Sequence, residues 1–336
     1  MLYFQVVILA AAMMLVYYCE FTDTFSPAQQ GFICKDPTLT KPDPGPEQDS
    51  RIQPVILYSV VGGLPVVLIS GVEVVIFLLH YNSNKLYDQE KIVIMGDCCY
   101  VNPMVRRTFR FLGVYVFGLF ATDIFVNAGQ LVTGSLAPYF LSVCQPNYTA
   151  LSCQDTAHFV NQSDACTGVP DDIMRARKAF PCKEAALSLY TAVYLAMYVM
   201  SCVGSTGGRL TGPFLSFSLV SLALLTGINR VAEYRNHWSD VIAGQAIGGA
   251  SAAFLVSFYL SNELNRHFGG HLYIIALTCC LISLKTSFHF RTYILPYMLV
   301  LFFIMPPLAE SQNIPEQLYL SCRTNTCKGL FYRQLV

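Results

Sequence analysis

The stretch from Pro213 to Ser261, PFLSFSLVSLALLTGINRVAEYRNHWSDVIAGQAIGGASAAFLVSFYLS, decides the fold of this 336-residue chain. It holds two apolar runs, Pro213 to Ile228 and Val241 to Ser261, separated by the polar residues 229–240. A helix needs about 20 mostly apolar residues to cross a bilayer and must satisfy its own backbone amides there. The stretch therefore predicts two transmembrane helices, and their glycines and polar flanks favour places inside a bundle.

Four more apolar runs precede this stretch: Leu2 to Cys19, Val55 to His80, Phe111 to Thr133 and Ala185 to Val203. The composition, with 54% hydrophobic and 12% charged residues, is typical of a membrane protein. The first run could be a signal peptide, but it lacks a basic n-region and an A-x-A cleavage site. We predict an all-α membrane protein, a six-transmembrane helical bundle over residues 1–261.

Charge in the loops predicts the orientation. The chain has 21 basic and 21 acidic residues, so no global attraction to nucleic acid is expected. Basic residues gather in the segment 81–110, which the positive-inside rule places in the cytosol. Residues 20–53, 134–184 and 229–240 are then external, and the longest of these loops carries two glycosylation sequons, at Asn147 and Asn161.

Cysteines in the external loops predict disulfides. Thirteen cysteines lie outside zinc-binding spacings, so we expect no metal and no cofactor. Five of the cysteines fall in external loops, which predicts one or two disulfides and one cysteine left over, with the pairing open: Cys34, Cys144, Cys153, Cys166 and Cys182.

Residues 262–336 form an atypical tail in this prediction. The apolar runs Leu272 to Leu284 and Tyr293 to Leu308 are marginal, because the first is short and Pro296 breaks the second. We expect an atypical apolar C-terminal extension.

The polar loop 229–240 carries the chemistry. It resembles the signature S-R-x5-H-x3-D of the lipid-phosphate phosphatases of the type 2 phosphatidic acid phosphatase superfamily. Arg230 and Asp240 match that signature, whereas Asn229 replaces its Ser and Asn236 its nucleophilic His.

Two further signatures of that family are also degenerate. P-S-G-H aligns with Pro181 followed by Cys182, Lys183 and Glu184, and K-x6-R-P aligns with Gln130 through Ala137-Pro138. The resemblance implies that the missing groups are the general acid, part of the phosphate-binding set and two cations. An Asn amide cannot attack phosphorus, and loss of one transition-state contact costs about 3 kcal/mol. We predict no catalytic activity.

Two features could rescue part of the site. His237 could replace the nucleophile, but the neighbouring position on a helix lies about 100° around the axis. Arg230 and Asp240 could still hold an anion, although an ion pair or hydrogen bonds that lock the loop to the helix are the simpler interpretation.

Polar residues inside the predicted spans allow two interpretations. Glu73, Asp123 and Asn127 could mark a transport path, since charges in spans are costly and commonly functional. Partnering within the bundle, or a protonated acid, explains them more simply.

Several strings resemble the phospholipid phosphatase-related, or plasticity-related, proteins, among them RRTFRFLG from Arg106 and CQPNYTAL from Cys144. The resemblance covers residues 1 to about 260. It implies plasma-membrane residence, no phosphatase activity, and a role in neurite outgrowth and lipid-phosphate signalling. The implied partners are membrane lipid, such as lysophosphatidate, and membrane proteins, including family members as oligomers. The alternatives are an active lipid phosphatase and a small transporter or receptor.

Overall fold

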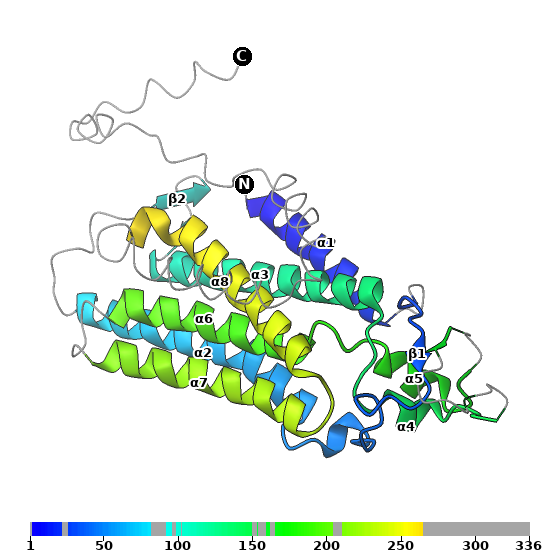
Figure 1. Cartoon of the computed structure of the whole chain (residues 1–336). Helices are drawn as coiled ribbons and strands as arrows, with labels where there is room; N and C mark the ends of the chain where they lie inside the picture. Colours follow the sequence, from blue (N-terminus) through cyan, green and yellow to red (C-terminus); the bar gives the residue numbers. More distant parts are fainter. Residues whose placement is uncertain are drawn as a thin grey trace, which may run out of the picture. The chain divides into compact units, whose positions relative to one another are not determined.

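Six long helices carry most of the residues that the computed structural model describes (Figure 1). They are α1 (Leu2–Phe21), α2 (Pro54–Tyr81), α3 (Pro103–Thr133), α6 (Lys183–Val203), α7 (Thr211–Ala232) and α8 (Trp238–Leu264). Each contains one of the six predicted apolar runs. The structure describes residues 2–21, 26–81, 92–95, 99–101, 103–149, 153, 159–161, 165–203 and 210–264. The predicted apolar segments of the tail lie outside these residues.

Among the residues that the structure describes, four helices are long and apolar enough to cross a membrane. The qualifying segments are Pro54–Leu78 of α2, Val105–Thr133 of α3, Thr211–Ala232 of α7 and Trp238–Ser257 of α8, and α1 holds a shorter apolar segment, Val7–Tyr18. In α6, every side chain that the structure describes is buried or half-buried. A helix enclosed by other helices need not be apolar all round, which explains why α6 carries several Tyr, Ser and Thr residues.

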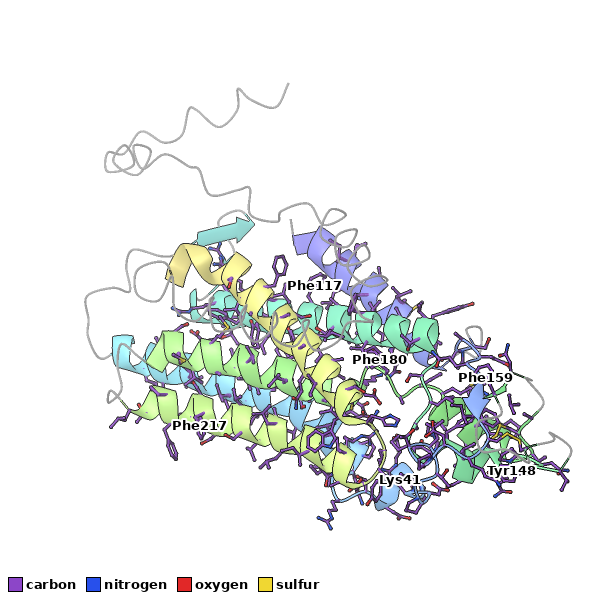
Figure 2. The ribbon with its side chains drawn as sticks, viewed as in Figure 1. Lys41, Phe117, Tyr148, Phe159, Phe180 and Phe217 are labelled. Carbon is purple, nitrogen blue, oxygen red and sulfur yellow. A yellow bond between two sulfur atoms is a disulfide. The ribbon has the colours of Figure 1, made fainter. Side chains whose placement is uncertain are left out.

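The expectation that the run Pro213 to Ile228 packs inside the bundle was wrong, whereas the same expectation for the run Val241 to Ser261 was right. The run Pro213 to Ile228 lies in α7, which exposes large apolar side chains such as Phe217, 73% accessible and pointing outward in Figure 2. In α8, Gly244 and Gly248 lie so close to the first turn of α6 and the residue before it that an added Cβ would collide with the carbonyls of Cys182 and Ala186. Small residues four apart allow this close helix contact.

Tyrosines connect α6 to its neighbours. Tyr190, Tyr194 and Tyr198 follow one another at four-residue spacing, so they share one face of the helix. Their hydroxyls donate to backbone carbonyls of Tyr115 and Phe111 in α3 and, at 3.5 Å, of Ile69 in α2. Each buried hydroxyl therefore has a partner, as an interior without water requires.

A proline inside α2 explains a further tyrosine hydrogen bond, from Tyr115 in α3 to Val61 in α2. Pro65 has no N–H, so it cannot donate to the carbonyl of Val61 one turn earlier. The hydroxyl of Tyr115 donates to that carbonyl at 2.7 Å. Neighbouring helices commonly satisfy the backbone groups that a proline releases in a spanning helix.

The two longest predicted external loops fold into one unit, called here the cap. Its elements are β1 (Phe32–Ile33), α4 (Phe140–Cys144), β4 (Phe159–Val160) and α5 (Pro170–Ala176), with β1 and β4 antiparallel. Disulfides join Cys34 to Cys153 and Cys144 to Cys166, which confirms the expected number of bridges and leaves Cys182 free. The cap encloses its own apolar core.

The chain is mostly helical but not all-α as predicted. Besides the β1–β4 pair, β2 (Ile92–Met95) pairs with β3 (Cys99–Val101). A short 3-10 helix, η1 (Glu47–Asp49), precedes α2. Strands this short are too brief to show the alternation of apolar and polar residues from which a strand is predicted.

The junction between α3 and the cap depends on Gly134. This residue follows the last residue of α3 with a φ of +55°, and its N–H donates to the carbonyl of Gln130. A left-handed glycine is a common helix terminator. A side chain here would also strike the carbonyl of Ala28. The helix end is thereby fixed, with Gln130 one turn before it.

Candidate functional site

The three segments that carry the degenerate signatures lie against one another. Gln130 at the end of α3 donates from Nε2 to the carbonyl of Pro181, at 2.9 Å. The N–H of Cys182 donates to the carbonyl of Asp240 at 3.0 Å, and its thiol lies 3.6 Å from Oδ1 of Asn236. The end of α3, the start of α6 and the α7–α8 turn therefore form one site.

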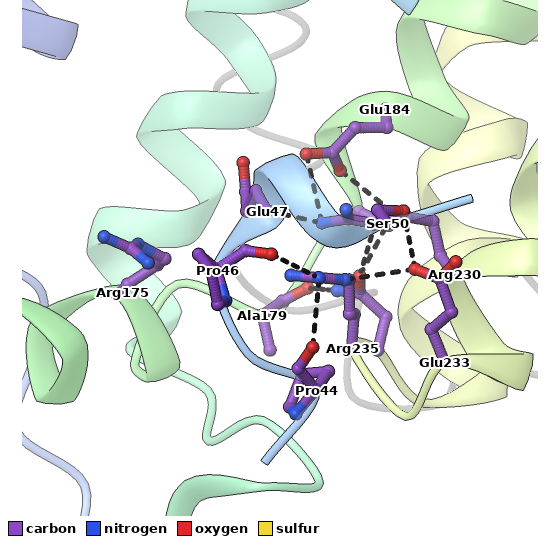
Figure 3. Close-up of polar contacts among 12 residues, drawn as sticks. Pro44, Pro46, Glu47, Ser50, Arg175, Ala179, Glu184, Arg230, Glu233 and Arg235 are labelled. Carbon is purple, nitrogen blue, oxygen red and sulfur yellow. Dashed lines mark hydrogen bonds and ion pairs between the residues drawn. The ribbon is translucent and has the colours of Figure 1, made fainter. Parts of the chain in front are cut away.

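Two carboxylates flank the Arg230 guanidinium (Figure 3). Nη2 lies 3.1 Å from Glu184 and 3.7 Å from Glu47, and Nε donates to Asn236 at 3.4 Å. Both Arg230 and Glu184 are largely buried. A phosphate that approached Arg230 would meet these two negative charges. Glu184 was predicted as part of this site, whereas Glu47 was missed, because only the fold brings η1 to the end of α7.

Asn236 has a structural role. Its Nδ2 donates to the carbonyl of Ala179 at 2.8 Å, while its Oδ1 accepts from Arg230. Both ends of the amide are engaged, so the side chain holds the turn against the loop before α6. The residue at the nucleophile position is therefore a bridge between two segments.

Cys182 is an unreactive thiol in this setting. Burial raises its pKa, the neighbouring Glu184 carboxylate raises it further, and the positive charge of Arg230 opposes both effects. The thiol therefore stays protonated at neutral pH, and a protonated thiol is a poor nucleophile.

Asp240 caps α8 and does not pair with Arg230. Its Oδ2 accepts from the backbone N–H of His237, the residue before α8, at 3.0 Å. An acidic side chain in the first turn that bonds back to the cap residue stabilises a helix start. The structural interpretation allowed either an ion pair or hydrogen bonds. Among the described residues, no salt bridge joins Arg230 to Asp240, whereas a hydrogen bond from His237 to Asp240 locks the loop to the helix.

The His237 ring also faces Asp240, with Nδ1 3.3 Å from Oδ2. His237 is about one-third exposed, whereas Asp240 is buried. A carboxylate that orients an imidazole is the arrangement that activates a catalytic His, but it occurs here one position beyond Asn236.

The other replaced positions make structural contacts. Lys183 reaches Asp123 in α3, with Nζ 3.0 Å from Oδ1. Ala137 is buried in the cap, and its N–H donates to the carbonyl of Ala176. Asn229 donates from Nδ2 to Glu233 at 3.1 Å. None of these side chains replaces a missing cation near Arg230.

The predicted polar residues of the spans have partners inside the bundle. Glu73, 2% exposed, lies 3.1 Å from the guanidinium of Arg107 and accepts from Tyr198. Asn127 donates to Asp123, which also pairs with Lys183. These contacts favour partnering over a transport path. Across the described residues, no three His, Cys, Asp or Glu side chains are grouped to hold a metal.

The sequon residues Asn147 and Asn161 are both exposed in the cap. Asn147 follows α4, and the hydroxyl of Thr149 donates to its Oδ1 at 2.6 Å. Asn161 directly follows β4. Both side chains are thus placed where a glycan would meet solvent.

Comparison with known proteins identifies related sequences. Residues 111–264 match the PAP2 superfamily. The phospholipid phosphatase-related protein type 5 of Xenopus laevis is 58% identical over 266 residues, which cover 79% of this chain and 85% of that protein. The human type 5 protein is also 58% identical, with 79% and 83% covered, and the Danio rerio type 1 protein is 49% identical, with 79% and 80% covered. No solved structure matches the chain.

Proposed function

Because the chain belongs to the phospholipid phosphatase-related proteins of the PAP2 superfamily, we propose that it is a catalytically inactive, phosphatase-like membrane protein. The observation that supports this proposal is the pairing of Arg230 with Glu184 and Glu47. Phosphoryl transfer requires cations at the developing negative charge, and the guanidinium of Arg230 is already neutralised by the carboxylates of Glu184 and Glu47. Asn236 also offers no nucleophile.

The test is phosphate release by purified protein in proteoliposomes that contain lysophosphatidate. We expect no release above that from vesicles without protein, while an active lipid phosphatase reconstituted in parallel releases phosphate. Sustained release that depends on this protein would refute the proposal.

A second candidate is turnover through His237, favoured by its contact with Asp240. It requires the imidazole to reach a phosphate beside the carboxylates of Glu47 and Glu184, which repel a dianion. Any activity found is therefore to be retested in His237→Ala. Loss of activity in that variant, with His267→Ala unchanged, would support this candidate.

The proposed topology has six spans, with the cap and the turn 229–240 external and the protein in the plasma membrane. Enclosure of α6 by its neighbours supports counting it as a span. In a glycosylating cell, an N-glycosidase should shift the gel mobility of the wild type, and Asn147→Gln with Asn161→Gln should remove that shift. An unshifted wild type would contradict an external cap.

We propose that the cellular role, in lipid-phosphate signalling and neurite outgrowth, works through membrane-protein partners, including other family members. A lysophosphatidate headgroup at Arg230 would have to displace a carboxylate, so association with partners is favoured over a permanently occupied lipid site. Proximity labelling with and without added lysophosphatidate would identify these partners. Failure to enrich any membrane protein over a cytosolic control would count against this role.

A further inference from the structure

An external segment of residues 41–51, called here the strap, lies across the α7–α8 turn (Figure 3). It includes three alternating prolines, Pro42, Pro44 and Pro46, which fix φ and favour an extended backbone. The strap follows Leu39, which is buried in the cap core, and leads to Pro54, the first residue of α2. Its two ends are thus anchored in different parts of the protein.

Hydrogen bonds join the strap to the turn at several points. Arg235 donates from Nη2 to the carbonyl of Pro46 at 3.1 Å and, at 3.5 Å, to that of Pro44. Glu233 accepts from the Ser50 hydroxyl at 2.6 Å and from the Arg51 N–H at 2.9 Å. The turn that carries the residues aligned with S-R-x5-H-x3-D therefore also holds the strap.

The strap contributes one of the two carboxylates at Arg230. Glu184 belongs to the first turn of α6, and its side chain is only 12% exposed. Glu47 belongs to η1, and its side chain is 35% exposed. A partly exposed ion pair is weakened by water and salt, whereas a buried one is not. The contact at Glu47 is therefore the one that can open.

We propose that the strap is an autoinhibitory lid whose Glu47 carboxylate takes the place of an anionic headgroup at Arg230. A phosphate monoester reaches Arg230 only when the strap lifts, and the hydrogen bonds to Glu233 and Arg235 set how readily that happens. This inference rests on the proposed function, because a lid over an inactive site regulates binding and not turnover.

The test uses full-length protein in nanodiscs, with Glu47→Gln as the opening variant. Asp49→Asn is the matched control, because it removes one negative charge from the same strap at an exposed residue. Hydrogen exchange of the peptide 41–53 reports on the lid. We expect Glu47→Gln to speed exchange of the Arg51 amide by about tenfold, a change equivalent to 1.4 kcal/mol, with Asp49→Asn at the wild-type rate.

Binding is measured on the same samples with two probes, short-chain lysophosphatidate and inorganic phosphate. We expect Glu47→Gln to bind lysophosphatidate more tightly than the wild type and Asp49→Asn do, and Glu47→Gln with Arg230→Gln to lose that gain. A gain for both probes would identify the phosphate group alone as the ligand, and a gain for lysophosphatidate only would show that the lipid chain contributes. Both results support the lid.

Unchanged exchange in Glu47→Gln, or a binding gain that survives Arg230→Gln, would overturn the inference. Phosphate released during the same incubation is assayed separately. Release would refute the inactive function, whereas exchange and binding report on the lid alone, so the two failures are distinguishable.

Discussion

The ammonium of Lys183 lies 3.0 Å from the carboxylate of Asp123, which joins the start of α6 to the middle of α3. Lys183 aligns with the glycine of the phosphatase signature P-S-G-H, so we infer that this ion pair accompanies the loss of the active site. Both side chains are about nine-tenths buried. A buried charge that loses its partner is strongly destabilising.

We therefore predict that Lys183→Gly lowers the stability of the protein by about 3 to 5 kcal/mol, and that adding Asp123→Asn recovers most of the loss. Thermal unfolding in detergent, followed by tryptophan emission or by aggregation, measures both variants. The control is Lys178→Gly, which removes a lysine outside the pair. Equal losses in Lys183→Gly and in the double variant would show that the pair is not the cause.

Repair of the nucleophile alone should leave the protein inactive. Asn236→His restores an imidazole, but the site still lacks a general acid and the cations replaced by Gln130 and Ala137, and residues that act as a unit give non-additive effects. Phosphate release from lysophosphatidate measures the result. Substantial activity from this single change would show that the other positions matter less than we infer.

Repair of the whole site should give measurable hydrolysis. The structure adds two changes that the sequence did not indicate, Asp123→Asn to suit the loss of Lys183 and Glu47→Gln to free Arg230. The full set is Glu47→Gln, Asp123→Asn, Gln130→Lys, Ala137→Arg, Cys182→Ser, Lys183→Gly, Glu184→His, Asn229→Ser and Asn236→His. A folded variant that neither turns over substrate nor binds vanadate would show that the site geometry has departed from the active family.

Tyr115→Phe should destabilise the bundle by about 1 to 3 kcal/mol, because the carbonyl of Val61 then loses its donor in a dry interior. Pro65→Ala supplies a backbone N–H to that same carbonyl. In the Pro65→Ala background, the cost of Tyr115→Phe should therefore be smaller. Thermal unfolding of the wild type, Tyr115→Phe, Pro65→Ala and the double variant measures the coupling between the two changes. An equal cost of Tyr115→Phe in both backgrounds would refute this account.

Strap closure should weaken in acid. Burial alone would raise the pKa of Glu233, but hydrogen bonds from Ser50, Arg51, Asn229 and Arg235 outweigh it and hold the pKa below its ordinary value of 4.5. The stabilisation of the closed strap by Glu233 is fully present above pH 4.5. It is lost as the pH falls through the lower pKa of Glu233 in the folded protein.

Exchange of the Arg51 amide, corrected for the intrinsic effect of pH, should accelerate over that acidic range in the wild type. Glu233→Gln should reduce this pH dependence, while Asp43→Asn, in the same strap, should retain it in full. A wild-type profile that stays flat down to about pH 3, below the ordinary carboxyl range, would contradict the assignment to Glu233.

The helices were predictable from sequence because their signal is long. Each of the six apolar runs falls within one described helix. The resemblance to a known family assigned Gln130, Cys182 and Asn236 to one site, and the structure brings the segments that carry them into contact. The outward face of α7 was missed. Glycines indicate that a helix can pack closely against a neighbour, but they do not show how many of its sides are covered. Gly227 packs toward Gln245 of α8, while Phe217 faces outward.

The cap and the lid were not predictable, because both depend on contacts between segments far apart in the chain. Phe32 pairs with Val160 in a ribbon too short for any periodic pattern. Glu47 was visible only as one of several acids in an external loop. No local pattern connects it to Arg230, and the tertiary fold alone makes the pair.

The Cys34–Cys153 bridge also sets an order of events during synthesis. Its two cysteines are 119 residues apart, and α2 and α3 lie between them. At about 5 to 20 residues per second, the first cysteine waits roughly 6 to 24 s for the ribosome to deliver the second. During that interval Cys34 is a free thiol open to wrong partners, and its native bridge can close only once Cys153 has been added, shortly before the fourth long helix begins at Lys183.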